Sequence, residues 1–226
     1  MNRAVLPIER RGAEVLVANE EDLYACLMRG FRPRIYGGRS VGMLYEKLLA
    51  LGGRLYGEGV SGYEYVRRIN NYFATTVRYD YAAAHDAGAY PLSYDFVAPL
   101  LENKCVCAGS AKLFGLLCAL VLIPSVIVIG RWRRGGGSLH AWNKVRLSLP
   151  QGEGWFNVDM TAAVPVSSCV PARGRFFLVS DREAEKTHIF LPNTLLPRYY
   201  RFNEYAGICG AGYPEADIEL DAWEKG

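Results

Sequence analysis

The chain has 226 residues, of which 50% are hydrophobic and 22% charged, and its formal net charge is +3. This composition excludes a disordered chain and permits one sizeable hydrophobic core. The small net charge gives no support for a nucleic-acid-binding protein, because such proteins concentrate Lys and Arg on one surface.

In chain order, we expect a small mixed N-terminal region over residues 1–59, a main core over 60–190 and a coil-rich extension over 191–226 packed on that core. In the first region we expect a strand at 15–17 and helices at 20–28 and about 43–51, followed by a turn-rich linker over 52–62. Asn19 is the expected N-cap of the helix at 20–28, because Asn at this position accepts from a free backbone amide of the first turn.

The main core begins with a predicted helix over 63–77, whose apolar residues recur on one side. An ordered loop is expected over 89–96. A helix that begins near Cys107 follows, and a strand is expected at 176–179 near the end of the core.

Residues 113–130 carry no charge, and this length is near the lower limit for a membrane-spanning helix. Pro124 lies inside the stretch and precedes the β-branched residues 126–129. A buried helix, a turn and a core strand therefore account for the same residues, and we expect no membrane contact.

Two further features bear on location and metals. The N-terminus lacks the apolar core of a signal peptide, so a cytoplasmic protein is the simplest interpretation, while export by another route stays open. Among the six cysteines, Cys105 and Cys107 are one residue apart, whereas common zinc motifs have two or more intervening residues. We expect no metal and no cofactor; Cys26 and Cys118 are expected to be buried free thiols.

Cys107 is the first candidate for covalent chemistry. The residues after it are Ala108, Gly109 and Ser110, and an apolar helical pattern follows. A cysteine at a helix N-terminus is exposed to the positive end of the dipole, which favours the nucleophilic thiolate over the thiol. We expect the three small residues to let a substrate carbonyl approach and to leave the Cys107 amide free to donate to an oxyanion.

His140 and Asp159 are the second and third candidates. Residues 139–147 alternate between apolar and polar, and residues 155–158 follow the turn-forming segment 150–154, so the two stretches predict an antiparallel hairpin. Its strands would bring Asp159 close enough to accept a hydrogen bond from His140 and orient the ring. His140 would then serve as the base toward Cys107.

These residues resemble the transglutaminase-like superfamily, which is related to the papain-like cysteine peptidases. The resemblance is carried by residues 106–111, by 140–143 with Val145, and by 155–159 with Thr161. It extends upstream to 70–72 and 77–81, which resemble the segment before the nucleophile in bacterial members. Three linked blocks in order are a stronger signal than any one of them. Ser110 departs from the family in standing where an aromatic residue is common.

The resemblance implies an α+β, papain-like core with the nucleophile at the N-terminus of a helix packed on an antiparallel sheet. It makes residues 60–190 a transglutaminase-like catalytic core with Cys107, His140 and Asp159 as its triad. The segment before the nucleophile helix lies near the cleft in this family. We therefore consider Tyr90, Ser93 and Tyr94 as substrate or oxyanion contacts, together with Trp142, which we expect in the core or in a groove wall.

Several residues compete for these roles. Cys105 precedes the helix and is expected to be structural or a resolving thiol. Asn143 could orient an imidazole in place of Asp159, although its odd offset from His140 points it to the opposite face of a strand. His85 and His188 have no strand-borne carboxylate at hairpin distance after them, and we expect both on the surface.

The predicted function is cysteine-dependent acyl transfer on a peptide or glutamine-type amide bond through a thioester. Water as acceptor gives a peptidase or amidase and an amine gives a transglutaminase; we favour hydrolysis by analogy with bacterial relatives.

The alternative is a catalytically silent scaffold that binds a protein or peptide in the same cleft. The expected partner is a peptide or protein substrate, with no nucleic acid and no membrane, and oligomeric state is left open. No clustered acidic loop supports a calcium site.

Overall fold

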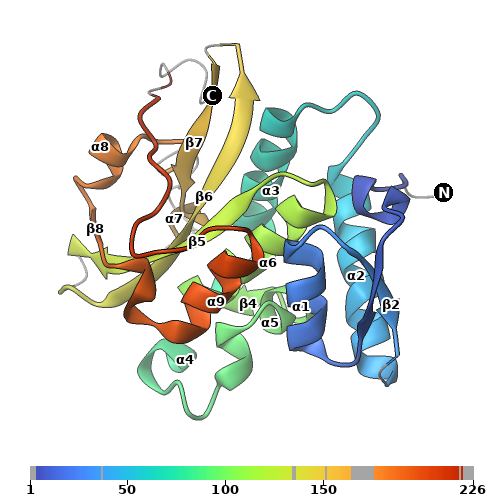
Figure 1. The fold of residues 1–226 in the computed structure, drawn as a ribbon. Coiled ribbons are helices and arrows are strands. Elements are labelled where there is room, and N and C mark those ends of the chain that lie inside the picture. The colour runs from blue at the N-terminus through green and yellow to red at the C-terminus, as the bar shows by residue number, and fades with distance from the viewer. Residues whose placement is uncertain are drawn as a thin grey trace.

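The computed structural model describes residues 4–36, 38–133, 136–150, 152–163, 176–218 and 220. Within these ranges the chain is an α+β protein in which helices pack on an antiparallel sheet with strand order β7-β6-β5-β8 (Figure 1). Short parallel pairs β1-β2 and β3-β4 lie outside that sheet.

The strands are β1 (Glu14–Val17), β2 (Arg32–Ile35), β3 (Arg78–Tyr79), β4 (Lys104–Cys105), β5 (Ser125–Trp132), β6 (Leu139–Leu149), β7 (Gly152–Val158) and β8 (His188–Phe190). The α-helices are α1 (Glu20–Met28), α2 (Arg39–Leu55), α3 (Gly62–Thr76), α4 (Tyr81–His85), α5 (Val97–Leu101), α6 (Cys107–Leu120), α7 (Met160–Ala163), α8 (Asp181–Ala184) and α9 (Pro197–Tyr205). The 3₁₀ turns are η1 (Pro7–Arg10), η2 (Pro91–Tyr94) and η4 (Asn193–Leu195).

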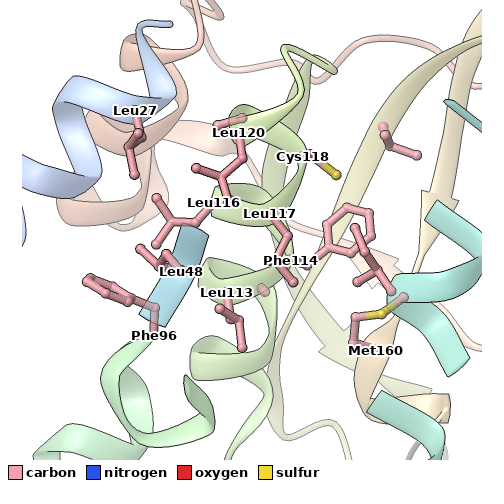
Figure 2. Close-up of a cluster of buried hydrophobic side chains, with 14 of the residues drawn as sticks. Leu27, Leu48, Phe96, Leu113, Phe114, Leu116, Leu117, Cys118, Leu120 and Met160 are labelled. Atoms are coloured by element: carbon pink, nitrogen blue, oxygen red, sulfur yellow. The ribbon is translucent and has the colours of Figure 1, made fainter. Parts of the chain in front are cut away.

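Helix α6 is the centre of the hydrophobic core. Every residue from Ala108 to Leu120 is buried, and most of them are apolar, which is typical of a helix enclosed by protein. The exceptions include Lys112, which is paired with Asp95. Figure 2 shows Leu113, Leu116 and Leu117 of this helix among side chains from neighbouring elements. Helices α1, α2, α3 and α5 and strands β5 and β6 all contact α6.

The uncharged stretch 113–130 is divided as expected into the end of α6, a turn and strand β5. In the part of the chain that the structure describes, we find no helix with the length and apolarity needed to cross a bilayer. The prediction that this stretch is a buried helix followed by a core strand is confirmed.

The N-terminal helix predictions are confirmed, with one helix longer than expected. Helix α1 has the expected bounds, and Asn19 Oδ1 accepts from the amide of Asp22 at 2.9 Å. Helix α2 continues to Leu55, past Gly52, which the sequence pattern assigned to a turn. A Cβ at Gly52 would lie 2.7 Å from the Leu120 side chain, so this glycine permits close packing against α6.

Two predictions for the C-terminal third were wrong. Residues 176–179 make only an isolated bridge, Asn157 to Val179, because Leu178 adopts a left-handed backbone with φ 52° that interrupts a strand. The extension expected to be coil contains helix α9, which begins at Pro197, a favourable residue for the first helical position.

Side chains from the C-terminal extension complete the free edge of β5. Strand β8 pairs only with Gly130–Trp132. Beyond it, Tyr213 Oη accepts from the amide of Ile129 at 3.0 Å. Asn203 of α9 accepts from the amide of Ile127 at 2.8 Å and donates to its carbonyl at 2.7 Å. These bonds satisfy backbone groups that an open sheet edge would leave unpaired.

Gly130 lies opposite His140 in the β5-β6 ladder, and it has no room for a side chain. An added Cβ would lie 2.3 Å from the Ile189 carbonyl oxygen and 2.4 Å from the Trp142 ring. We predict that Gly130→Ala lowers the free energy of unfolding by about 1–3 kcal/mol, because backbone and a buried ring must move. Urea unfolding measures the change.

Gly12→Ala is the matched control, since a Cβ at Gly12 meets nothing within 4 Å. We expect it to change the free energy of unfolding by less than about 0.5 kcal/mol. Equal stability of the two variants would contradict the steric account of Gly130.

Candidate active site

Cys107 is the first residue of α6 and follows the extended N-cap residue Val106. It is partly exposed, whereas the rest of the helix is buried. The predicted helix start is therefore confirmed. The thiol lies at the positive end of a buried helix and remains accessible from outside.

The small residues after Cys107 do not have the role that we expected. Ala108, Gly109 and Ser110 are all buried, so they face protein and leave no opening for a substrate. A Cβ at Gly109 would lie 2.6 Å from the Ser93 carbonyl oxygen. Gly109 thus lets η2 lie directly against the start of α6, and the amide of Val106 donates to that same Ser93 carbonyl at 3.1 Å. This contact helps to fix the position of Cys107.

Cys105 is buried, and its Sγ lies 3.2 Å from Ser110 Oγ. Burial raises the pKa of the Cys105 thiol to about 12, although the Ser110 hydrogen bond opposes the rise. At neutral pH this thiol stays protonated and is out of reach of solvent. The geometry therefore favours Cys107 over Cys105 as the reactive cysteine.

His140 and Asp159 are brought together by the β6-β7 hairpin. His140 Nε2 lies 2.8 Å from Asp159 Oδ2, and both side chains are buried. The other carboxylate oxygen, Oδ1, accepts from the amide of Thr161 at 2.9 Å. Cys107 lies close enough to His140 to contribute to raising the pKa of the imidazole. With Nε2 directed at Asp159, Nδ1 is the ring nitrogen left for the sulfur.

The electrostatics of this group favour the ion pair. Burial alone would lower the pKa of His140, but the charge and hydrogen bond of Asp159, with smaller contributions from Cys107, outweigh it and raise the pKa to about 10. Burial likewise opposes ionisation of Asp159, yet His140 and His188 hold the pKa of the carboxyl well below its ordinary value. At neutral pH the pair is an imidazolium and a carboxylate.

The four weaker site candidates are placed differently. Ser93 is buried and its hydroxyl donates to Asp80 Oδ2 at 2.6 Å, while the Tyr94 hydroxyl donates to the carbonyl of residue 83 at 3.1 Å. Both hydroxyl groups therefore already donate their proton to a group within the protein. Trp142 is 1% exposed and belongs to the core, where its Nε1 donates to an asparagine. Tyr90 is exposed at the start of η2.

Asn143, the alternative orienting residue, lies elsewhere. Its Nδ2 donates to the carbonyls of Ala111 on α6 and Val126 on β5, at 3.1 and 3.3 Å. This buried amide joins the nucleophile helix to the sheet and makes no recorded bond to His140. The odd offset between the two residues on β6 explains the difference.

His188 is the residue that the sequence analysis placed wrongly. We expected a surface imidazole, but His188 is 1% exposed and its Nε2 lies 3.4 Å from Asp159 Oδ2. His85, by contrast, is exposed as expected. The signal for His188 is weak in sequence, because its strand β8 has only three residues and pairs with β5, which lies more than 50 positions earlier.

Among the described residues, His140, Asp159 and His188 are also the group whose side-chain atoms lie close enough together to be tested as a metal site. His140, Asp159 and His188 each offer one ligand atom, and these atoms lie within 4.8 Å of one another. Zinc accepts imidazole and carboxylate ligands. However, His140 and Asp159 are already joined by a 2.8 Å hydrogen bond, which an entering ion would have to break. The contacts fit a hydrogen-bonded cluster better than a metal centre.

A cysteine at a helix N-terminus, an imidazole whose pKa it influences and a carboxylate bonded to that imidazole are the residue types of a cysteine-nucleophile triad. Residues 50–160 match the family model described as Transglutaminase-like superfamily. This part of the chain belongs to the transglutaminase-like superfamily.

Two solved structures resemble the chain. One, described as a TGase, has 19% identity and a TM-score of 0.43, with coverage of 68% of this chain and 36% of that one. The other, described as a "Putative Cysteine Protease" from Cytophaga hutchinsonii, has 22% identity and a TM-score of 0.40, with coverage of 54% and 39%. This chain thus aligns with less than two fifths of either protein. No curated protein matches it.

The rate of alkylation distinguishes the two neighbouring thiols, Cys105 and Cys107. We predict that iodoacetamide at neutral pH modifies Cys107 rapidly and Cys105 hardly at all, because only Cys107 is partly exposed at a helix N-terminus. Peptide mapping by mass spectrometry identifies the modified residue. Cys209 is exposed and also reacts, so the experiment uses a Cys209→Ser background.

In that background, Cys107→Ala should abolish the fast modification and Cys105→Ala should leave it unchanged. The reverse pattern would exchange the roles of the two cysteines.

A second prediction concerns the charge on His140. In Asp159→Asn the carboxylate charge is lost while the volume is kept, so burial becomes dominant and the pKa of His140 falls from about 10 toward or below its ordinary value of about 6.5. NMR titration of the histidine ring signals measures this shift, with His140→Ala used to assign them.

The same shift predicts a pH dependence of stability. Because folding raises the pKa of His140, its stabilising contribution is complete below about pH 6.5 and is lost as the pH rises to about 10. Denaturant unfolding between these values should show a loss of stability in the wild type that is smaller in Asp159→Asn. Identical slopes would contradict the assignment.

Proposed function

We propose that this chain is a cysteine-dependent acyl-transfer enzyme with a papain-like core that acts on peptide or glutamine-type amide bonds through a thioester. Cys107 is the nucleophile, His140 moves the proton and Asp159 orients His140. The observation that carries the proposal is the buried His140–Asp159 pair, with its 2.8 Å hydrogen bond, together with its electrostatic interaction with Cys107, a partly exposed residue at a helix N-terminus.

In the first half of the reaction the Cys107 thiolate attacks the carbonyl carbon, and the carbonyl oxygen becomes an oxyanion. We assign the backbone amide of Cys107 as a donor to it, because amides of the first helical turn have no acceptor within the helix. The His140 imidazolium gives its proton to the leaving amine as the carbon–nitrogen bond breaks. The product is a thioester on Cys107 and a neutral imidazole.

In the second half the neutral His140 takes a proton from the acceptor, which attacks the thioester carbon and releases the thiolate. Water yields a carboxylic acid and an amine yields a new amide. We favour hydrolysis, since water needs no binding surface of its own. A peptide or protein is the proposed substrate, and neither half of the reaction requires a cofactor.

The test incubates the purified protein with a peptide library and an added primary amine, followed by mass spectrometry. We expect cleaved or deamidated peptides, with fewer amine adducts. Cys107→Ala should reduce product formation by at least about 10³-fold, since it removes the covalent step. His140→Ala should cost about 10²- to 10⁴-fold, the usual contribution of a general base.

Cys105→Ala is the matched control and should retain activity, because its thiol is buried beside the site and takes no part in the reaction. If amine adducts exceed hydrolysis products, the acceptor is an amine and not water, and the thioester intermediate still stands. If the wild type and Cys107→Ala both yield no product while the protein still binds peptides, the proposal fails and the non-catalytic scaffold is the better interpretation.

A further inference from the structure

His188 lies in a closed aromatic environment beside the triad. It is the first residue of β8, pairs with Trp132 of β5 and is 1% exposed. Its ring centroid lies 4.2 Å from that of Phe176, 4.8 Å from Trp142 and 5.4 Å from His140. Packing on these sides fixes the orientation of the imidazole.

The two nitrogens of His188 have different partners. Nδ1 lies 2.8 Å from the hydroxyl of Thr187, and Nε2 lies 3.4 Å from Asp159 Oδ2. Within the described part of the chain Nε2 has no hydrogen bond of standard geometry. The carboxylate approach is therefore the polar contact recorded for it.

The surroundings select one tautomer. A buried imidazole nitrogen is stable beside a carboxylate oxygen only when it carries a proton. The Thr187 hydroxyl has one proton and two acceptors in reach, the Ala184 carbonyl at 3.4 Å and Nδ1 at the shorter distance of 2.8 Å. With that proton directed at Nδ1, the ring proton lies on Nε2 and points toward Asp159. Asp159 then receives protons from His140, from His188 and from the amide of Thr161.

We propose that His188 is a positioning residue of this site: it shares the Asp159 carboxylate with His140 and thereby sets how strongly that carboxylate holds the His140 imidazolium. The proposal rests on the function proposed above for Cys107 and His140. It adds a second imidazole, oriented by Thr187, behind the Cys-His-Asp arrangement.

The sign of the effect follows from charge. A donor on Asp159 withdraws part of the negative charge that stabilises the His140 imidazolium, so removing His188 should make His140 more basic. The titratable groups that interact with Asp159 are His140, His188 and Tyr79, and Cys107 interacts with His140 and Tyr79. Burial raises the pKa of Tyr79, so this hydroxyl stays neutral over the pH range used.

The experiment measures the rate of Cys107 alkylation by chloroacetamide against pH, in the Cys209→Ser background, without any substrate. The rate should change near pH 10, where His140 loses its proton and its positive charge no longer acts on Cys107. In His188→Phe, which keeps an aromatic ring in the aromatic pocket, we expect this inflection to move upward by about half a pH unit, the effect of losing one weak hydrogen bond to a charge. His188→Gln, which keeps an N–H donor, should restore most of the wild-type profile.

Thr187→Val provides a second variant that keeps the shape of a partly exposed residue and removes the tautomer-selecting hydroxyl. It should shift the inflection in the same direction by a smaller amount, and it tests the proposal if His188→Phe fails to fold. His85→Phe is the matched control at an exposed histidine and should leave the profile unchanged.

An unchanged or lowered inflection in folded His188→Phe and Thr187→Val overturns the proposal, because a residue with a packing role alone would not raise it. This outcome is independent of the peptide assay. If the amide-bond activity is absent but the inflection moves as expected, the proposed function fails and the role of His188 in the cluster stands.

Discussion

A single buried carboxylate organises the site. Asp159 is 1% exposed, and an ionised group so far from water is stable only when donors surround it. The recorded hydrogen-bond partners are His140 from the hairpin and the amide of Thr161 just after it. The proposed third donor, His188, comes from a strand that pairs with the far side of β5, and its Nε2 lies 3.4 Å from Asp159 Oδ2. The sheet must therefore be complete, from β7 to β8, before the carboxylate is satisfied. Because the ionised form of Asp159 is what raises the pKa of His140, the chemistry proposed for Cys107 depends on the packing of the whole sheet.

The nucleophile is placed by a second constraint, the burial of α6. A helix enclosed on all sides has no freedom to slide or rotate, so its first residue has a defined position. Gly109 and Asn143 fix that position from two directions. Gly109 admits the backbone of η2, and Asn143 bonds the helix to β6 and β5. The core that stabilises the protein is thus also what aligns the thiol with His140, which extends from the same strand as Asn143.

Local patterns predicted the parts of this arrangement that are encoded locally. The start of α6 at Cys107, the N-cap at Asn19 and the hairpin that joins His140 to Asp159 each depend on residues within about twenty positions of one another, and all three are present. His188 could not be found in this way, because only the pairing of β8 with β5 brings it to Asp159. The predicted strand at residues 176–179 failed for a related reason: its residue types suit a strand, but tertiary packing places Leu178 in a left-handed conformation. Gly52 and Gly109 were interpreted as a turn and as space for a substrate, whereas both are sites where another segment packs closely.

The position of His188 also bears on how the site excludes water. His140 and His188 both lie against Trp132, with ring centroids 5.0 and 5.3 Å from it, and Phe176 and Trp142 cover other sides of His188. Aromatic walls lower the local dielectric, which strengthens the attraction between Asp159 and the His140 imidazolium and at the same time increases the cost of any unpaired proton or lone pair.

A purely apolar side chain at position 188 would keep the wall but leave a carboxylate lone pair facing it without a donor. An imidazole satisfies both requirements, because its ring completes the aromatic enclosure and its N–H faces the carboxylate. On this argument the residue behind the proposed triad has to be both aromatic and a hydrogen-bond donor, and the neighbouring hydroxyl of Thr187 is what directs the ring proton of His188 toward the carboxylate.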